Sequence, residues 1–180
     1  TGCVTTRIPN ANHPLPADTA ILFDHALNPY GFSHVRRVTE DNVDLNRNFV
    51  DHGNAKPANP GYDALREFIC PKEWTEESEH PNLAALHAYA AEHGVDALET
   101  AIASGQYVDA QGVFYGGTQP TWSNRTLRAI LQPFAATARH VAFIDLHTGL
   151  GPYGFGEIMS NHGARDPGRG AGGVDHAVVL

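Results

Sequence analysis

The chain has 180 residues, of which 42% are hydrophobic, and its formal net charge is −8. This composition predicts a globular protein that can bury roughly 70% of the surface exposed by its unfolded chain. The acidic balance argues against a nucleic acid or an anionic membrane surface as the main partner, and no apolar run is long enough to predict a membrane span.

The first half of the chain predicts one strand and several helices. The apolar run at residues 18–27 (DTAILFDHAL) predicts a buried strand, and a polar loop is expected from residue 28 to about residue 60. A short helix is expected over residues 61–69. Residues from about 81 to 104 show helical spacing of apolar side chains and predict two helices broken at Gly94.

The second half predicts another helix and further strands. Ser123 and Asn124 are suitable N-caps for a helix over about 125–138. The segment 140–149 (HVAFIDLHTG) predicts a second strand, and 155–161 (FGEIMSN) is a candidate for a third.

Strands that alternate with helices predict an α/β fold with a mixed, mainly parallel sheet covered by helices. Such sheets bind their ligands beyond the carboxyl ends of the strands. The polar sequences HALNPYG and DLHTGLG follow the two predicted strands at such positions. No domain boundary is evident, so the sequence predicts a single domain over residues 1–180.

The cysteines and one histidine bear on compartment and metal binding. Cys3 and Cys70 match no C-x-x-C pattern, which favours free thiols and a cytoplasmic protein, with a disulfide in a secreted protein as the alternative. His147 ends the second predicted strand, with Asp145 on the same face, and can offer an imidazole nitrogen to a metal. Its alternative is a histidine bonded to a neighbouring carbonyl. His25 ends the first predicted strand and is either a second ligand or a packed side chain.

Three arginines in the polar loop are candidates for binding an acid. Arg47 follows Asn46, and an Arg–Asn pair suits a substrate carboxylate. Arg36 and Arg37 lie about ten residues upstream, where an arginine can polarise a carbonyl oxygen. The alternative is that these arginines pair with the acidic residues of the same solvated loop.

The motifs HALNPYG, VDLNRNF, YGGTQPTWSN and DLHTGLGPYG, in this order, resemble the zinc carboxypeptidase superfamily. That superfamily includes metallocarboxypeptidases and the aspartoacylase and succinylglutamate desuccinylase deacylases. The likeness is greatest to a largely bacterial, poorly characterised branch and covers residues from about 16 to about 156. It implies a three-layer α/β sandwich of the zinc carboxypeptidase type and a bound Zn²⁺.

The resemblance also implies roles for individual residues. His147 matches the third zinc ligand of the family. Asn46 and Arg47 match the pair that grips the free carboxylate of the substrate. Arg37 matches the arginine that polarises the scissile carbonyl, with Arg36 as the reserve candidate. 

Some other positions match a structural motif of the family, and some of the family's motifs have no match in this chain. Tyr115, Gly117 and Ser123 match a Y-x-G…S motif that is mainly architectural, although Tyr115 is also a candidate to line the pocket. The H-x-x-E motif that supplies the family's first two zinc ligands has no match before the first predicted strand, where His13 is a poor substitute. The catalytic glutamate of the family belongs to a later strand. We therefore expect the chain to be a fragment that is inactive alone and lacks the first and last segments of the fold.

The expected function of the intact parent is zinc-dependent hydrolysis of an amide or peptide bond next to a carboxylate-bearing residue. Its partner would be a peptide or a small molecule with a free carboxylate. One alternative is a non-catalytic module that binds carboxylate-terminated ligands, and another is an inactive truncated product.

Overall fold

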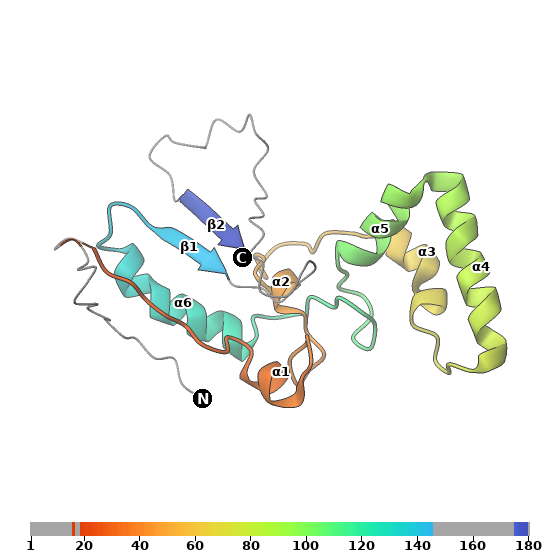
Figure 1. Cartoon of the computed structure of the whole chain (residues 1–180), viewed down its shortest axis with the longest axis horizontal. Coiled ribbons are helices and arrows are strands. Elements are labelled where there is room, and N and C mark those ends of the chain that lie inside the picture. Colours follow the sequence, from red (N-terminus) through yellow and green to blue (C-terminus); the bar gives the residue numbers. More distant parts are fainter. Residues whose placement is uncertain (1–15, 17–18, 146–174, 180) are drawn as a thin grey trace. The chain divides into compact units, whose positions relative to one another are not determined.

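The computed structural model describes Pro16, residues 19–145 and residues 175–179, and the chain divides into two compact units, residues 1–127 and 128–180. Each unit is described by itself. The elements along the described residues are α1 (Pro29–His34), α2 (Leu45–Asn48), α3 (Pro60–Ile69), α4 (Glu76–His93), α5 (Val95–Ala103), α6 (Trp122–Ala135), β1 (Ala142–Asp145) and β2 (Asp175–Val179), labelled in Figure 1.

Two short helices lie within the segment that the sequence predicts as a loop. The Asn28 side chain accepts a hydrogen bond from Gly31 N at 3.0 Å and caps α1, which begins at Pro29. The Asp44 carboxylate accepts from Asn46 N at 2.9 Å and caps α2. Capping side chains satisfy backbone donors that a helix leaves unpaired, so they permit helices with little apolar surface.

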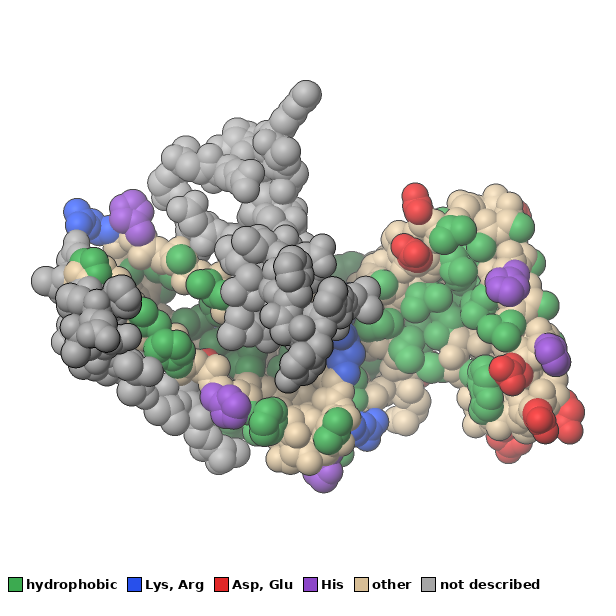
Figure 2. Space-filling view, in the orientation of Figure 1, with side chains coloured by type: hydrophobic (Ala, Val, Ile, Leu, Met, Phe, Trp, Pro, Cys, Tyr) green, Lys and Arg blue, Asp and Glu red, His purple; other side chains and the backbone are tan. Residues whose placement is uncertain are grey.

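The helices α3, α4 and α5 pack against one another and form one group. Tyr62 and Leu65 of α3 and Ala101 of α5 are buried, and hydrophobic side chains gather over this group in Figure 2. The predicted break at Gly94 is confirmed: this residue separates α4 from α5 with a φ of 95°, which glycine adopts without steric cost. The predicted short helix is confirmed as α3.

The helix α4 begins five residues before the predicted start of the helical region. Thr75 and Ser78 form a reciprocal capping box at this end. Three glutamates occupy the first turn, where they interact favourably with the helix dipole. Figure 2 shows acidic side chains at this end of α4.

The helix α6 begins at Trp122, earlier than predicted, and ends at Ala135. The predicted caps Ser123 and Asn124 therefore lie inside its first turn, and both are buried. The predicted second strand is confirmed in its described part as β1, which pairs in parallel with β2. The register joins Ala142 to Asp175 and Asp145 to Val179, with an irregularity between them.

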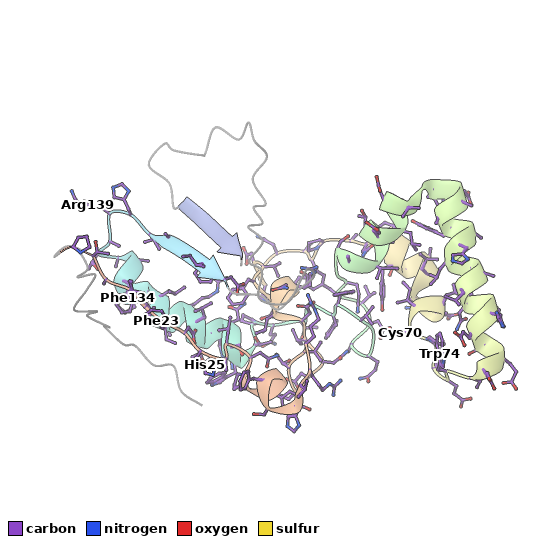
Figure 3. The ribbon with its side chains drawn as sticks, in the orientation of Figure 1. Phe23, His25, Cys70, Trp74, Phe134 and Arg139 are labelled. Atoms are coloured by element: carbon purple, nitrogen blue, oxygen red, sulfur yellow. The ribbon has the colours of Figure 1, made fainter. Side chains whose placement is uncertain are left out.

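The prediction of a buried strand over residues 18–27 is wrong. Residues 19–26 form no strand in the structure, and Ile21 and Phe23 are 42% and 48% exposed; Phe23 is labelled in Figure 3. An apolar run becomes a strand only where a neighbouring strand satisfies its backbone hydrogen bonds, and no such neighbour is present among the described residues.

The wider fold prediction is not decided by these elements. The parallel pair β1–β2 is of the kind that an α/β sheet contains, but two strands do not test a three-layer sandwich, which stays a prediction. The candidate strand at 155–161 lies outside the described residues. In the part of the chain that the structure describes, no helix has the length and apolar character needed to cross a bilayer.

Candidate functional site

Residues 36–48, which carry the three candidate arginines, form hydrogen bonds that hold the turn-rich segment 105–121 in place. Asp44 N donates to the Tyr115 carbonyl oxygen at 2.7 Å. The Asn42 side chain donates to the Gly112 carbonyl oxygen at 3.0 Å. Backbone groups in a segment without regular structure need such partners when they are buried. The polar residues of the arginine-bearing segment therefore stabilise the fold, whatever role they also have in binding.

The centre of this contact is Asn48, which is fully buried at the end of α2. Its Nδ2 donates to the carbonyl oxygens of Gly116 and Gln119, each at 2.9 Å. Its Oδ1 accepts from Thr121 N at 2.9 Å and from Asn124 Nδ2 at 3.2 Å. The side chain thus ties α2 to the start of α6 through both its donor and its acceptor.

Asp44 connects the two parts of the predicted arginine site. One carboxylate oxygen caps α2, the helix that carries Arg47, and the other accepts from Arg37 Nε at 2.9 Å. The Asp44 side chain is only 3% exposed, whereas 52% of the Arg37 side chain is exposed. For Arg37 the alternative of pairing with a nearby acid is therefore confirmed, but the acid is buried rather than solvated.

The Arg47 side chain reaches the end of α5. Its Nη2 donates to the Ala103 carbonyl oxygen at 2.5 Å, and Nη1 lies 3.5 Å from the Asn46 carbonyl oxygen. Gly105 leaves room for this side chain, since a Cβ there would lie 2.5 Å from Arg47 Cδ. Its φ of 89° also lies in the region that favours glycine.

Two further observations concern polar groups at Arg47. The Tyr107 hydroxyl donates to the Arg47 carbonyl oxygen at 2.6 Å. Burial raises the pKa of Tyr107, and the nearby Arg47 charge opposes part of that change. Arg47 Nε is buried and has no hydrogen-bond partner among the described residues. A buried donor of this kind calls for an acceptor, and a ligand oxygen is one candidate.

The structure brings Arg37 and Arg47 together at Phe114. The Cζ atom of Arg37 lies 5.2 Å from the centroid of the Phe114 ring, and that of Arg47 lies 5.9 Å from it. Both distances are within the range of a cation–π contact. Two guanidinium groups at one ring form a local positive centre that can bind an anion or stabilise negative charge on a carbonyl oxygen.

The remaining predicted residues occupy different places. Asn46 is exposed on α2, and its backbone N–H belongs to the Asp44 cap. Arg36 is exposed just after α1. Tyr115 is 8% exposed and contributes its carbonyl oxygen to the contact with Asp44, which supports the architectural role predicted for it. His147 lies outside the described residues, so its predicted zinc role stays a prediction.

The described residues contain no candidate metal site of three or more His, Cys, Asp or Glu side chains. His25, the other histidine weighed as a ligand, has its ring edge-on to the Phe32 ring at 5.2 Å and lies beside α1 in Figure 3. His25 is exposed, and this single ring contact leaves both alternatives for it as predictions.

Sequence reasoning named Asp44 only among the acids of a solvated loop, and it missed Asn48 and Phe114. The role of Asp44 as the N-cap of α2 could have been predicted, because Asp is a favoured residue at the position before a helix. Asn48 belongs to the DLNRNF motif, but asparagine is usually exposed, so its residue type does not predict complete burial. Phe114 gives no sequence signal at all, since its position near two arginines depends on contacts far along the chain.

A family model described as "Protein of unknown function (DUF2817)" matches residues 2–171. The chain belongs to the DUF2817 family. The match covers the α1–α2 segment, the segment around Phe114 and the predicted strand that ends at His147. No curated protein and no solved structure matches the chain.

Proposed function

We propose that this protein is a zinc-dependent hydrolase of the zinc carboxypeptidase type. It cleaves an amide or peptide bond next to a carboxylate-bearing residue in a peptide or a small acyl amino acid. The observation that supports this proposal most directly is the meeting of Arg37 and Arg47 at one aromatic ring. These are the two arginines to which the sequence resemblance gives the carbonyl-polarising and carboxylate-binding roles.

In the proposed reaction Arg47 binds the substrate carboxylate. A carboxylate that replaces the Ala103 carbonyl oxygen at Nη2 would also satisfy the buried Nε, so that the guanidinium fork matches both ligand oxygens. Asn46 is exposed beside it and offers a neutral donor. Carboxylate binding fixes the substrate so that the scissile carbonyl is held near Arg37.

Arg37 stabilises the negative charge that develops on the carbonyl oxygen when water adds to the carbonyl carbon. Its Nε is held by the buried Asp44, while half of the side chain remains exposed and can meet a ligand. The C–N bond then breaks, and the amine leaves with a proton. Because Asp44 already orients the Arg37 side chain, this side chain loses less conformational entropy when the substrate binds.

Zinc is the part of the proposal that rests on the sequence resemblance. His147 would be one of its ligands, and the described residues bring no complete ligand set together. In hydrolases of this type zinc polarises the carbonyl and activates water. The arginine site can be tested separately from the metal.

The first experiment measures the binding of N-acetylglycine by calorimetry, with N-acetylglycinamide as the neutral control. We expect the acid to bind and the amide to bind at least ten-fold more weakly, because a charged hydrogen bond contributes about 1.5–3 kcal/mol. Arg47→Ala should weaken binding of the acid about 10- to 100-fold, and Arg47→Lys should remain weaker than the wild type because it lacks the fork.

Two arginine variants serve as controls. Arg66→Ala changes an exposed arginine on α3 and should leave binding unchanged. Arg36→Ala tests the reserve candidate against Arg37→Ala, and we expect the larger loss with Arg37. Equal affinity for the acid and the amide, in a folded wild-type protein, would falsify the carboxylate site.

A second candidate function is a module that binds carboxylate-terminated ligands without hydrolysis. It rests on the same meeting of Arg37 and Arg47 at Phe114, which offers an acid two guanidinium groups whether or not a metal is bound elsewhere. Zinc content separates the two functions. Near-stoichiometric zinc that is lost in His147→Ala supports the hydrolase, whereas carboxylate binding by a protein that takes up no zinc supports the binding module.

A further inference from the structure

The Phe114 ring is the element that Arg37 and Arg47 share. The ring belongs to the turn-rich segment between α5 and α6, whereas both arginines come from the segment around α2. A cation over an aromatic face is attracted by the ring quadrupole, and the attraction increases as water is excluded. One ring thus orients two charged groups that would otherwise repel each other.

The backbone at Phe114 is held in a conformation that its own side chain disfavours. Its φ is +52°, in the left-handed region that non-glycine residues rarely adopt. Gln106, which is 1% exposed, fixes the segment: its N–H donates to the Phe114 carbonyl oxygen at 3.1 Å, and its Nε2 donates to the Val113 carbonyl oxygen at 3.3 Å. Strained residues persist where surrounding contacts over-determine them, and they concentrate at functional sites.

Asp44 adds a second constraint on the same group. It holds Arg37 Nε with its carboxylate, and its N–H donates to the carbonyl oxygen of Tyr115, the residue that follows Phe114. The Phe114 ring and the Asp44 carboxylate, which both contact Arg37, are therefore linked to each other through the backbone at Tyr115. Movement of the Phe114 segment would change the place of both guanidinium groups at once.

We propose that Phe114 is a positioning residue that holds the guanidinium groups of Arg37 and Arg47 so that a single compact acid meets both. The inference rests on the proposed function and adds a limit on the ligand. The two guanidinium carbons lie 5.2 and 5.9 Å from one ring centroid, so they cannot be further apart than the sum of these distances, and a ligand that meets both has its carboxylate and its carbonyl within that span. An acyl amino acid meets this limit, and a long-chain acid with a remote carbonyl does not.

The test compares Phe114→Leu and Phe114→Tyr in the full chain, with N-acetylglycine as the probe in calorimetry. Leu keeps apolar volume and the strained backbone but lacks an aromatic face, whereas Tyr keeps the ring. We expect Phe114→Leu to weaken binding about five-fold and Phe114→Tyr to stay within about two-fold of the wild type. Phe68→Leu, on α3, is the matched control and should bind as the wild type does.

A double-mutant comparison separates positioning from a general effect on the fold. In the Arg47→Lys background we expect Phe114→Leu to cause a smaller loss than in the wild type, because one of the two contacts with the ring is already altered. A purely structural role for Phe114 predicts the same loss in both backgrounds and no rescue by Tyr. Thermal unfolding measured in parallel shows whether each variant is folded, and Phe114→Met replaces the Leu variant if that one is not.

The outcomes also distinguish this inference from the proposed function. If Arg47→Ala abolishes binding of N-acetylglycine while Phe114→Leu binds as the wild type does, the positioning role is wrong and the carboxylate site stands. Failure of the wild-type protein to prefer the acid over N-acetylglycinamide overturns both. Equal losses in Phe114→Leu and Phe114→Tyr also overturn the positioning role.

Discussion

At the scale of single residues, this protein places uncharged polar side chains where a hydrophobic core would normally lie. Asn48 and Asn124 are both fully buried and bonded to each other, and Gln106 is buried close to the strained Phe114. Buried amides are tolerated because their donors and acceptors are paired, and the geometry of those pairs permits one arrangement of the chain. The positions of Arg37 and Arg47 follow from this framework.

The residue most important for this framework is Asn48. Asn48→Ala removes partners from the Gly116 and Gln119 carbonyl oxygens and from Thr121 N, so we expect the free energy of unfolding to fall by about 3 kcal/mol. Urea denaturation measures this change. Asn54→Ala, at an exposed turn, is the matched control and should change stability by less than about 0.5 kcal/mol. Equal effects of the two substitutions would show that the Asn48 contacts contribute little.

At the scale of elements, the helical group of α3, α4 and α5 combines buried large side chains, such as Tyr62, with a close approach of two helices. Gly61, at the start of α3, faces Ala101 of α5 and the Tyr89 hydroxyl of α4. Small residues at a helix contact permit the backbones to approach, and any added atom must displace its neighbours. The start of α3 is also joined to α5 by Asn59, whose Nδ2 donates to the Ala101 carbonyl oxygen at 2.9 Å.

Gly61→Ala tests this packing. The new Cβ would lie 2.7 Å from Ala101 Cβ, so we expect the free energy of unfolding to decrease by about 1–3 kcal/mol. Ala101→Gly alone should destabilise by about 1 kcal/mol, since it places glycine within a helix. In the double variant the clash is removed, and its destabilisation should be smaller than the sum of the two single effects. Strict additivity in chemical denaturation would contradict the proposed contact.

At the scale of the whole molecule, the structure predicts a loss of stability in alkaline solution. The Tyr62 side chain is fully buried, and this burial, together with the nearby Cys70 and Asp109, raises its pKa from 10.0 to about 12. Folding therefore favours the neutral phenol. The contribution of neutral Tyr62 to the free energy of unfolding is fully present below pH 10 and is lost as the pH rises from 10 through about 12.

Tyr62→Phe isolates this effect. The variant has no phenol to ionise, so the decrease in its free energy of unfolding between pH 10 and pH 12 should be smaller than that of the wild-type protein. Denaturation at several pH values measures the difference. Tyr30→Phe, which changes a less buried tyrosine on α1, is the control and should retain the wild-type slope. Parallel slopes for Tyr62→Phe and the wild type would show that Tyr62 is not responsible.

Several features could be predicted from the local sequence because their causes are local. Helical spacing and Gly94 gave α4 and α5, and the apolar run before His147 gave β1. The order of the motifs pointed to Arg37 and Arg47, which the structure brings to one ring. The zinc ligand His147 and the carboxylate-binding role of Asn46 stay predictions.

Other features could not be predicted because their causes lie far along the chain. The apolar run with Ile21 and Phe23 satisfies every local rule for a strand, yet an isolated run has no partner for its backbone hydrogen bonds. The helices α1 and α2 could not be predicted in this polar segment because each begins at a side-chain cap, and α2 also depends on contacts of Asn48 with residues about 70 positions later. Sequence spacing does not report such contacts.

The sequence by itself determined which chemical groups this protein has to use: guanidinium groups beside amides, in an order that resembles a hydrolase family. Only the tertiary structure decided which of them lie together. Asp44 selects Arg37 rather than Arg36, Asn48 rather than Asn46 becomes the buried amide, and Phe114 joins two arginines that are ten residues apart. The physical reason is that burial and electrostatic pairing depend on distance in space, and a chain of 180 residues creates those distances only when it folds.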